Sequence, residues 1–209
     1  FKNFKTVPGP GIKNKIGTSL GSHIHEKSKY FLNSQKSNTF IKNIFSDVCS
    51  PLKPMRQIIS QTFHKQISTA SENKMSYSDC VIRIHDEGDS VHLHRDNCNF
   101  EMPDYTVSKY ENQLSAVLYL QSPERGGELT VYDKKWNRYD EYSRQPDFGY
   151  SFDLVNDVSH TSISPTTGSL VLLNPNFYHK VESVHGNRSR VSIGFFFAES
   201  SEYELSCWT

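Results

Sequence analysis

Two histidines and one aspartate in this sequence have the spacing of a metal site. His94 and Asp96 are separated by one residue at the end of a predicted strand, and His179 lies far downstream, after an apolar strand and an Asn-Pro turn. Because side chains alternate along a strand, residues two apart can point to one face and meet at one ion. Two imidazoles and one carboxylate form the facial ligand set that holds Fe(II) and leaves positions open. We therefore predict a metal site at His94, Asp96 and His179.

A second group of residues predicts an anion site near this metal site. Arg190 lies eleven residues after His179, and Arg190, Ser192 and Gly194 share one face of a predicted strand, with the glycine leaving room inside. The fork of a guanidinium matches a carboxylate bidentately, and a buried arginine needs an anionic partner. Arg188 has the same strand parity and competes with Arg190. The serine two residues later favours Arg190.

Further residues are candidates for the same pocket, and most have a structural alternative. Tyr119 would either contact the anion or pack in the core, and Asn174 would either contact it or cap a turn. Arg83 would bind an anion if it points inward, whereas an outward arginine would be solvated. The other expected substrate contacts are His92, Glu101 and Trp136.

The elements that must position these residues are helices followed by short strands. Apolar residues recur with a helical period from Ser37 to Val48, and again after Pro54 through Ile67. We expect these two helices to cover one face of a sheet. Beyond Ala70 the pattern changes to short runs bounded by turns, which predict strands. The expected strands are residues 80–85, 90–94, 113–121, 128–132, 160–163, 169–173, 178–183 and 190–198.

Eight short strands after two helices indicate a mainly β fold with flanking helices, a double-stranded β-helix or jelly roll. We expect a single domain over residues 1–209, in which 1–77 form an N-terminal arm and supporting helices and 78–198 form the jelly-roll core. Within the arm, Pro8 to Gly11 break regular structure, and residues 1–35 are expected to be extended, with one short element near Tyr30.

The sequence also predicts two long loops, and three histidines that lie in turns or on the surface. Residues 97–112 and 133–158 are long loops, which in a compact domain are usually functional, so we expect them to form the substrate wall. Acids in the first loop, such as Glu101 and Asp104, could receive a cationic amine. The remaining histidines that we expect in turns or on the surface are His85, His160 and His185.

Composition limits the class of partner. The chain has 209 residues, and its 23 basic and 23 acidic residues give a formal net charge of +0. Such a chain has no general basic field that would attract nucleic acid or an anionic membrane. No apolar run approaches the ~20 residues of a membrane span, and no signal-peptide pattern opens the chain. Four widely spaced cysteines fit reduced thiols. We expect a cytoplasmic protein with a small-molecule partner, and leave the oligomeric state open.

The motifs and their order along the chain resemble those of the non-haem Fe(II)/2-oxoglutarate-dependent oxygenases. The resemblance covers roughly residues 78–198 and rests on His-x-Asp, the distal histidine and Arg-x-Ser. It also includes Leu118-Tyr119-Leu120, Gly126-Gly127-Glu128-Leu129 and the run from Thr167 to Leu173. The order is like that of the prolyl-4-hydroxylase-related branch. The resemblance implies Fe(II) on the predicted metal ligands, 2-oxoglutarate with its distal carboxylate on Arg190 and Ser192, and O2 as cosubstrate.

The longer run from Gly126 to Trp136 is similar to bacterial small-molecule members of this family, including the carrier-independent halogenases. Those halogenases have Gly or Ala in place of the carboxylate ligand, so that chloride can take its position. Because Asp96 is present here, the resemblance implies oxygenation and not halogenation. It implies oxidation of an unactivated C–H bond of a small metabolite, an amino acid or a derivative, by hydroxylation, with desaturation and oxidative cyclisation as alternatives.

Three other functions stay open at this point. Within the family, the alternative is a prolyl-4-hydroxylase-type enzyme that hydroxylates a protein residue. His92-Leu93-His94 resembles the His-x-His motif of the cupins, and a cupin-like metalloprotein would not use 2-oxoglutarate. In the cupins a Glu follows this motif at a fixed spacing, and here it does not. Arg190-x-Ser192 also argues against the cupin alternative. A non-catalytic jelly-roll binding module would lose the iron, and the intact metal triad argues against that.

Overall fold

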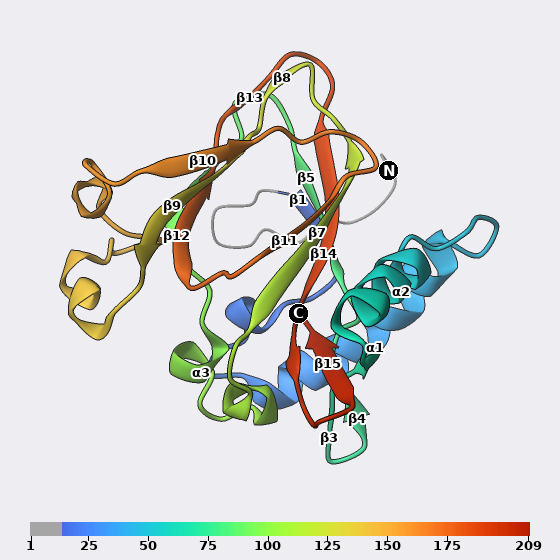
Figure 1. The fold of residues 1–209 in the computed structure, drawn as a ribbon. Coiled ribbons are helices and arrows are strands. Elements are labelled where there is room, and N and C mark those ends of the chain that lie inside the picture. Colours follow the sequence, from blue (N-terminus) through green and yellow to red (C-terminus); the bar gives the residue numbers. More distant parts are fainter. Residues whose placement is uncertain (1–13) are drawn as a thin grey trace.

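The computed structural model describes residues 14–209 (Figure 1), so the predicted breaker at Pro8 to Gly11 lies outside the described residues. Most strands belong to two sheets, whose strand pairs are antiparallel except for one parallel pair (Figure 1). This mainly β architecture with flanking helices confirms the predicted fold class. None of the helices within residues 14–209 is long and apolar enough to cross a membrane.

The larger sheet has the order β1-β5-β14-β15-β2, and β7 pairs with both β14 and β11. Its strands are β1 (Asn14–Ile16), β2 (Gln66–Thr69), β5 (Val81–His85), β7 (Leu114–Gln121), β11 (Leu170–Leu173), β14 (Arg190–Glu199) and β15 (Glu204–Trp208). The smaller sheet has the order β10-β9-β12-β6. Its strands are β6 (Val91–His94), β9 (Leu129–Lys135), β10 (His160–Ile163) and β12 (Phe177–Val181).

Short elements close the ends of these sheets. Two further sheets have two strands each: β3 (Ser71–Glu72) with β4 (Met75–Ser76), and β8 (Arg125–Gly126) with β13 (Val184–His185). The helices are α1 (Lys27–Ile44), α2 (Leu52–Phe63) and α3 (Cys98–Glu101), and the 3-10 turns are η1 (Leu20–Ser22), η2 (Thr106–Lys109), η3 (Arg138–Ser143) and η4 (Phe152–Leu154). The division into residues 1–77 and 78–198 stays a prediction, although β1, β2 and β15 of the larger sheet lie outside 78–198.

Helix α1 begins well before the predicted start at Ser37, so the expectation of an extended segment up to residue 35 is wrong. Its buried face follows Tyr30, Ser34, Ser37 and Ile41, a helical spacing that two serines hide from a search for apolar residues. Helix α2 ends earlier than predicted, because His64 adopts a left-handed φ of 54° and terminates it. Ile67 therefore belongs to β2 and not to the helical stripe.

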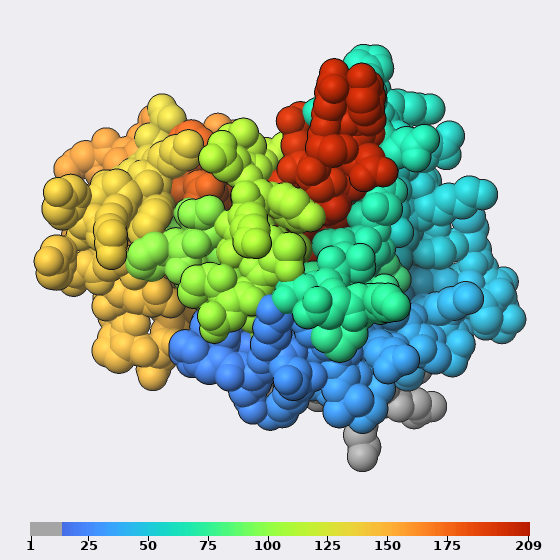
Figure 2. Space-filling model, turned by 90° about the horizontal axis from the view of Figure 1, so that it is seen from below, coloured from blue at the N-terminus to red at the C-terminus, as the bar shows by residue number. Residues whose placement is uncertain are grey.

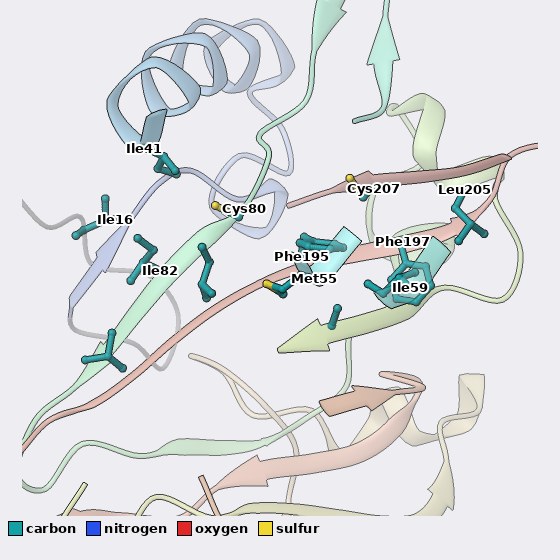
Figure 3. Packing of buried hydrophobic residues seen from close by; sticks show 13 residues of the cluster. Ile16, Ile41, Met55, Ile59, Cys80, Ile82, Phe195, Phe197, Leu205 and Cys207 are labelled. Atoms are coloured by element: carbon teal, nitrogen blue, oxygen red, sulfur yellow. The ribbon is translucent and has the colours of Figure 1, made fainter. Parts of the chain in front are cut away.

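The two long helices cover one face of the larger sheet, as predicted. Ile41 of α1 and Met55 and Ile59 of α2 pack in one buried cluster with Ile82 of β5 and Phe197 of β14 (Figure 3). The opposite face of this sheet is then free to line the space between the sheets. The fold therefore separates a stabilising side, under the helices, from an interior side that polar residues can occupy.

A second buried cluster ties the two ends of the described chain together. Tyr30 and Phe31 of α1 pack with Tyr77, Tyr105 and Trp208. The Tyr30 hydroxyl donates a hydrogen bond of 2.6 Å to the backbone carbonyl of residue 209. Seen from below, the N-terminal segment, the region of α3 and η2, and the C-terminal strand lie side by side on one face (Figure 2).

Candidate metal and anion site

A register step in β6 turns the first histidine into the interior. Strand β6 pairs with β12 so that Val91 lies opposite Val181 and His94 lies opposite His179, with a register shift between the two pairs. Three steps along β6 therefore match two along β12, which is the signature of a β-bulge. Val91 and His94 both line the interior cavity, whereas His92 is exposed and lies outside it. The expected substrate contact of His92 is therefore not supported, because the bulge turns its side chain away from the cavity.

The predicted metal ligands lie together. The ligand atoms of His94, Asp96 and His179 are all within 4.8 Å of one another. Nε2 of His94 is 4.0 Å from Oδ2 of Asp96, and Nε2 of His179 is 3.6 Å from the same oxygen. Metal–ligand bonds to such atoms are about 2.0–2.2 Å long, so one ion between them can reach all three. The cluster is therefore a candidate metal site.

Both imidazoles are oriented by their own strands. Nδ1 of His94 lies 2.8 Å from the backbone carbonyl of His92, and Nδ1 of His179 lies 2.8 Å from that of Phe177. A ring nitrogen that donates to a carbonyl carries the proton, so the lone pair is on the other nitrogen. Nε2 is therefore the nitrogen of each ring that is left to bind a metal, and both Nε2 atoms lie near the carboxylate of Asp96.

The charge states of the cluster also suit a cation. Burial, and then the nearby His179, lower the pKa of His94 to about 4. Burial alone would raise the pKa of Asp96, but the hydrogen bond with His179 and the charges of His94, His179 and Arg83 lower it to about 2. At neutral pH, His94 is neutral and Asp96 is ionised, which are the forms that bind metal.

The segment after β6 is held from two sides. The backbone N–H of Asp96 donates to the carbonyl of Pro175 over 2.9 Å. The Arg95 side chain is fully buried and forms ion pairs of 3.0 Å with Glu101 and with Glu141. Its guanidinium lies 4.4 Å from the centroid of the Trp136 ring. Arg95 fixes the direction in which Asp96 leaves the strand, and no motif or spacing in the sequence pointed to this role.

The anion site lies in the same cavity. Arg190 is 3% exposed, its Nε donates to the carbonyl of Gly127 over 2.9 Å, and Nη1 donates to Oγ of Ser192 over 3.4 Å. Gly127 has a φ of +72°, and a Cβ there would lie 2.9 Å from Cδ of Arg190, so the glycine allows this contact. The Arg190 guanidinium lies 5.0 Å from the centroid of the Tyr119 ring.

The polar groups around Arg190 are incompletely satisfied. Among residues 14–209, no carboxylate forms an ion pair with Arg190, and the buried Tyr119 hydroxyl has no hydrogen-bond partner. Burial lowers the pKa of Arg190 from its usual value. Because a buried guanidinium without an anion is costly, this end of the cavity suits a ligand carboxylate.

The structure separates the remaining candidates near this end. Arg188 is exposed and donates to the carbonyl of Pro123 over 3.1 Å, so it is outside the cavity. Asn174 also lies outside, and its Oδ1 accepts from the N–H of Asn176 over 3.0 Å, which is the turn-capping alternative. His85 was expected in a turn but is buried beside Arg190, because the inner face of β5 continues through residues 81, 83 and 85.

The cavity has a volume of about 190 Å³ and is lined by both sheets. The predicted metal ligands and the residues of the anion site both line the cavity. On β14, the lining residues run from Arg190 through Ser192 to Phe196. The two long loops contribute less than expected. The first contributes Asn97, Cys98, Glu101 and Met102, and the second contributes Phe148. Trp136, a predicted substrate contact, packs on Arg95 and does not line the cavity.

Comparison with known proteins finds relatives of this chain. The family described as carrier-protein-independent halogenase WelO5 matches residues 4–209. Leucinostatins biosynthesis cluster protein S of Purpureocillium lilacinum is 27% identical over 185 residues, which are 85% of this chain and 74% of that protein. L-gamma-glutamyl-L-propargylglycine hydroxylase of Streptantibioticus cattleyicolor is 26% identical over 130 residues, which are 60% of this chain and 47% of that protein.

The fold is shared with a solved structure. The crystal structure of an N-substituted L-amino acid dioxygenase from Burkholderia ambifaria in complex with α-ketoglutarate superposes with a TM-score of 0.65. The superposition covers 92% of this chain and 77% of that chain, at 14% sequence identity. At this identity the likeness concerns the fold, and it agrees with the predicted jelly roll.

Proposed function

The chain belongs to the family of the carrier-protein-independent halogenase WelO5, which is a family of Fe(II)/2-oxoglutarate-dependent enzymes, and from this premise we propose that it hydroxylates an amino-acid derivative. Membership confirms the resemblance found in the sequence. Two points go beyond family membership and are proposals: the class of substrate, and hydroxylation in place of halogenation.

Asp96 is the observation that carries hydroxylation. Its Oδ2 lies 3.6 Å and 4.0 Å from the Nε2 atoms of the two histidines, and its carboxyl is ionised at neutral pH. The resemblance implies that this carboxylate takes the position where the halogenases have Gly or Ala. With a carboxylate as the third ligand, the position that chloride would need is taken. This supports oxygen transfer to the substrate and argues against halogen transfer.

We assign Fe(II) to His94, Asp96 and His179, and the distal carboxylate of 2-oxoglutarate to Arg190 and Ser192. When bound, iron and 2-oxoglutarate use O2 to convert a C–H bond to C–OH, with succinate and CO2 as the other products. The chain supplies the orientation. Backbone carbonyls direct both Nε2 atoms at the metal, and Arg190 supplies the charge that complements the cosubstrate. The buried Tyr119 hydroxyl supplies a further hydrogen bond at that end.

The substrate class is a proposal supported by cavity size and by relatives. A cavity of about 190 Å³ suits a small molecule, which favours a metabolite over a protein residue. One relative is described as a hydroxylase of L-gamma-glutamyl-L-propargylglycine, and the superposed structure as a dioxygenase of N-substituted L-amino acids. The chain spans about half the length of that hydroxylase.

The four cysteines form no disulfide, which supports the proposed cytoplasmic location.

The test is Fe(II)-dependent conversion of 2-oxoglutarate to succinate by the purified protein, measured without added substrate. We expect turnover with Fe(II) and 2-oxoglutarate, and loss of turnover in His179→Ala. The matched control is His160→Ala, because His160 is exposed and lies outside the cavity. Turnover that does not need Fe(II), or that survives in His179→Ala, would contradict the proposal.

A further inference from the structure

Two cationic side chains line the cavity in addition to Arg190. Arg83 of β5 lies opposite Ser192 of β14 on one side and opposite Lys15 of β1 on the other. Lys15 is 3% exposed, and its Nζ donates to Oγ of Ser19 over 3.1 Å and to Oγ of Ser22 over 2.6 Å. Within residues 14–209, no carboxylate forms an ion pair with Arg83 or Lys15. The cavity therefore carries positive charge that no carboxylate of the described residues contacts, although the charge of Asp96 acts on Arg83 from a distance.

The Arg83 side chain extends away from the cosubstrate end. A Cβ at Gly194 would lie 3.3 Å from Nη1 of Arg83 and 2.7 Å from the carbonyl of Ala116, so glycine at this position leaves room for the guanidinium. Gly194 is two residues beyond Ser192 along β14, on the side away from Arg190. Arg83 is thus placed for an anion other than the one assigned to Arg190.

The acids that line this cavity are already engaged. Asp96 belongs to the candidate metal site. Glu101 forms ion pairs of 3.0 Å with Arg95 and 3.5 Å with Arg144. Asp104 is exposed and does not line the cavity, and residues 1–13 contain no Asp or Glu. The expectation that acids of the loop 97–112 receive a cationic amine is therefore not supported.

We propose that the substrate is an N-acylated amino acid, held by its carboxylate on Arg83 and Lys15, an inference that rests on the proposed function. A carboxylate matches the guanidinium fork and offsets the charge of two neighbouring cations. A free α-ammonium group would add a further positive charge to a cavity without an available acid, and acylation removes that charge. The structure thus selects an acid with an uncharged nitrogen over a zwitterionic amino acid.

Burial supports the need for a ligand anion at this place. Burial and then the neighbouring charge of Arg83 lower the pKa of Lys15 to about 8. A carboxylate between the two side chains would favour the protonated lysine and oppose both effects. Ser19 and Ser22 hold the Lys15 ammonium in place, so little further ordering is needed when the ligand binds.

The experiment uses calorimetry on the full chain loaded with Mn(II), as an inert substitute for Fe(II), and with 2-oxoglutarate. The probes are the N-acetyl derivatives of L-valine, L-leucine, L-methionine and L-phenylalanine, with the matching free amino acids and N-acetyl amides. We expect at least one N-acetyl acid to bind about tenfold more tightly than its amide and than its zwitterion, a difference of about 1.4 kcal/mol. An amide or a zwitterion that binds equally well, or a panel in which no N-acetyl acid binds, would overturn the proposal.

Variants locate the binding site. In Arg83→Gln, the affinity for the N-acetyl acid is expected to fall about tenfold or more, because a buried charge loses its partner. Arg83→Lys should restore part of it, and the dissociation constant for 2-oxoglutarate should change less than about twofold. Arg138→Gln is the control, because Arg138 is exposed. An unchanged affinity in Arg83→Gln refutes the assignment.

The two proposals fail in different ways. If only the substrate inference is wrong, 2-oxoglutarate still binds and Fe(II)-dependent succinate formation is intact. If the proposed function is wrong, succinate formation itself is absent. Stimulation of succinate formation by the same N-acetyl acids in the iron-loaded protein then connects binding to turnover.

Discussion

At the scale of single residues, the proposal of oxygen transfer in place of halogen transfer depends on Asp96. Replacing it with glycine removes one ligand and its negative charge, while both imidazoles keep their orientation from backbone carbonyls. We expect Asp96→Gly to lower the yield of hydroxylated product at least about 100-fold, since loss of a ligand exceeds the effect of losing a group behind it. With added chloride, the variant is expected to bind the halide at the metal. Mass spectrometry of products, with and without chloride, measures both.

The matched control for this change is Asp157→Gly, because Asp157 is exposed and lies outside the cavity. It should retain the hydroxylation rate of the parent protein. Full hydroxylation by Asp96→Gly would remove this residue from the ligand set, whatever the halide does.

Arg190 and Arg188 are two residues apart and allow a direct comparison. Arg190 is buried against Ser192 and Gly127, whereas Arg188 is exposed. Truncating one partner of a buried charge pair costs about 2 kcal/mol or more, so Arg190→Gln should weaken 2-oxoglutarate binding about thirtyfold or more. Arg188→Gln should change it less than twofold, by about 0.4 kcal/mol at most. Calorimetry with 2-oxoglutarate and Mn(II) tests the pair, and equal effects would contradict the assignment.

The residues that sequence could predict are those whose position follows from spacing alone. Asp96 follows His94 at two residues, and Ser192 follows Arg190 at two, so local geometry brings each pair together. His92 and Trp136 failed as predicted contacts for a different reason. A bulge reversed the face of His92, and Arg95 holds Trp136 away from the cavity, and neither event leaves a pattern in the sequence.

At the scale of elements, Glu141 organises the loop of residues 133–158. Its carboxylate accepts from the Tyr150 hydroxyl over 2.6 Å and from Nε1 of Trp136 over 2.7 Å. It also pairs with Arg95 at 3.0 Å and with Arg144 at 3.2 Å. Burial would raise the pKa of Glu141, but these hydrogen bonds lower it to about 2. The loop is therefore fixed to β6 through Arg95, and it holds Phe148 near His94.

This cluster predicts a pH dependence of stability. Because the pKa of Glu141 in the folded state is below its usual value, its contribution is complete above that usual value and is lost as the pH falls toward 2. Glu141→Gln should lower the free energy of unfolding at pH 7 by about 1.5–3 kcal/mol, the range for hydrogen bonds to a charged group. The difference from the parent protein should shrink on acidification below about pH 4.

Chemical denaturation at several pH values measures this difference. Glu202→Gln is the control, because Glu202 is exposed, and it should be neutral throughout. A difference between Glu141→Gln and the parent that grows as the pH falls would refute this account of the loop.

The helices show where periodicity suffices and where it fails. The stripe of α2 was predicted from its apolar residues, and Met55 and Ile59 are buried as expected. In α1 two serines occupy buried positions of the stripe. Ser34 can do so because its hydroxyl donates to the carbonyl of Ser76 over 2.7 Å. Such a partner is visible only once the chain has folded, so the start of α1 could not be read from the sequence.

At the scale of the whole molecule, stability and chemistry lie on opposite faces of the larger sheet. Ile59 of α2 is 0% exposed under that sheet, whereas the adjacent Ile58 is 48% exposed. Ile59→Ala should reduce the free energy of unfolding by about 2–4 kcal/mol, and Ile58→Ala by less than about 0.5 kcal/mol. Urea denaturation followed by circular dichroism measures both. Equal losses, or a changed dissociation constant for 2-oxoglutarate in folded Ile59→Ala, would contradict this separation.

The ends of the described chain were the least predictable part of the fold. Strand β1 contributes Lys15 to the cavity, and β15 completes the larger sheet beside β14. Both strands are short and carry polar residues, so their pairing depends on partners far away in the sequence. The hydrogen bond from the Tyr30 hydroxyl to the carbonyl of residue 209 likewise joins residues far apart in the sequence. The interior strands, which carry the metal ligands and Arg190, were predicted within a few residues because each is an apolar or alternating run bounded by turns.

The bulge in β6 places one side chain on the outer surface close in sequence to a predicted metal ligand. The side chain of residue 92 is exposed, although its own backbone carbonyl orients the imidazole of His94. A His92→Cys variant, made with the exposed Cys49 changed to Ser, would carry a fluorescent or isotopic label only two residues from that ligand without entering the cavity. Paramagnetic quenching of such a label would report metal loading directly, in real time and without any knowledge of the substrate.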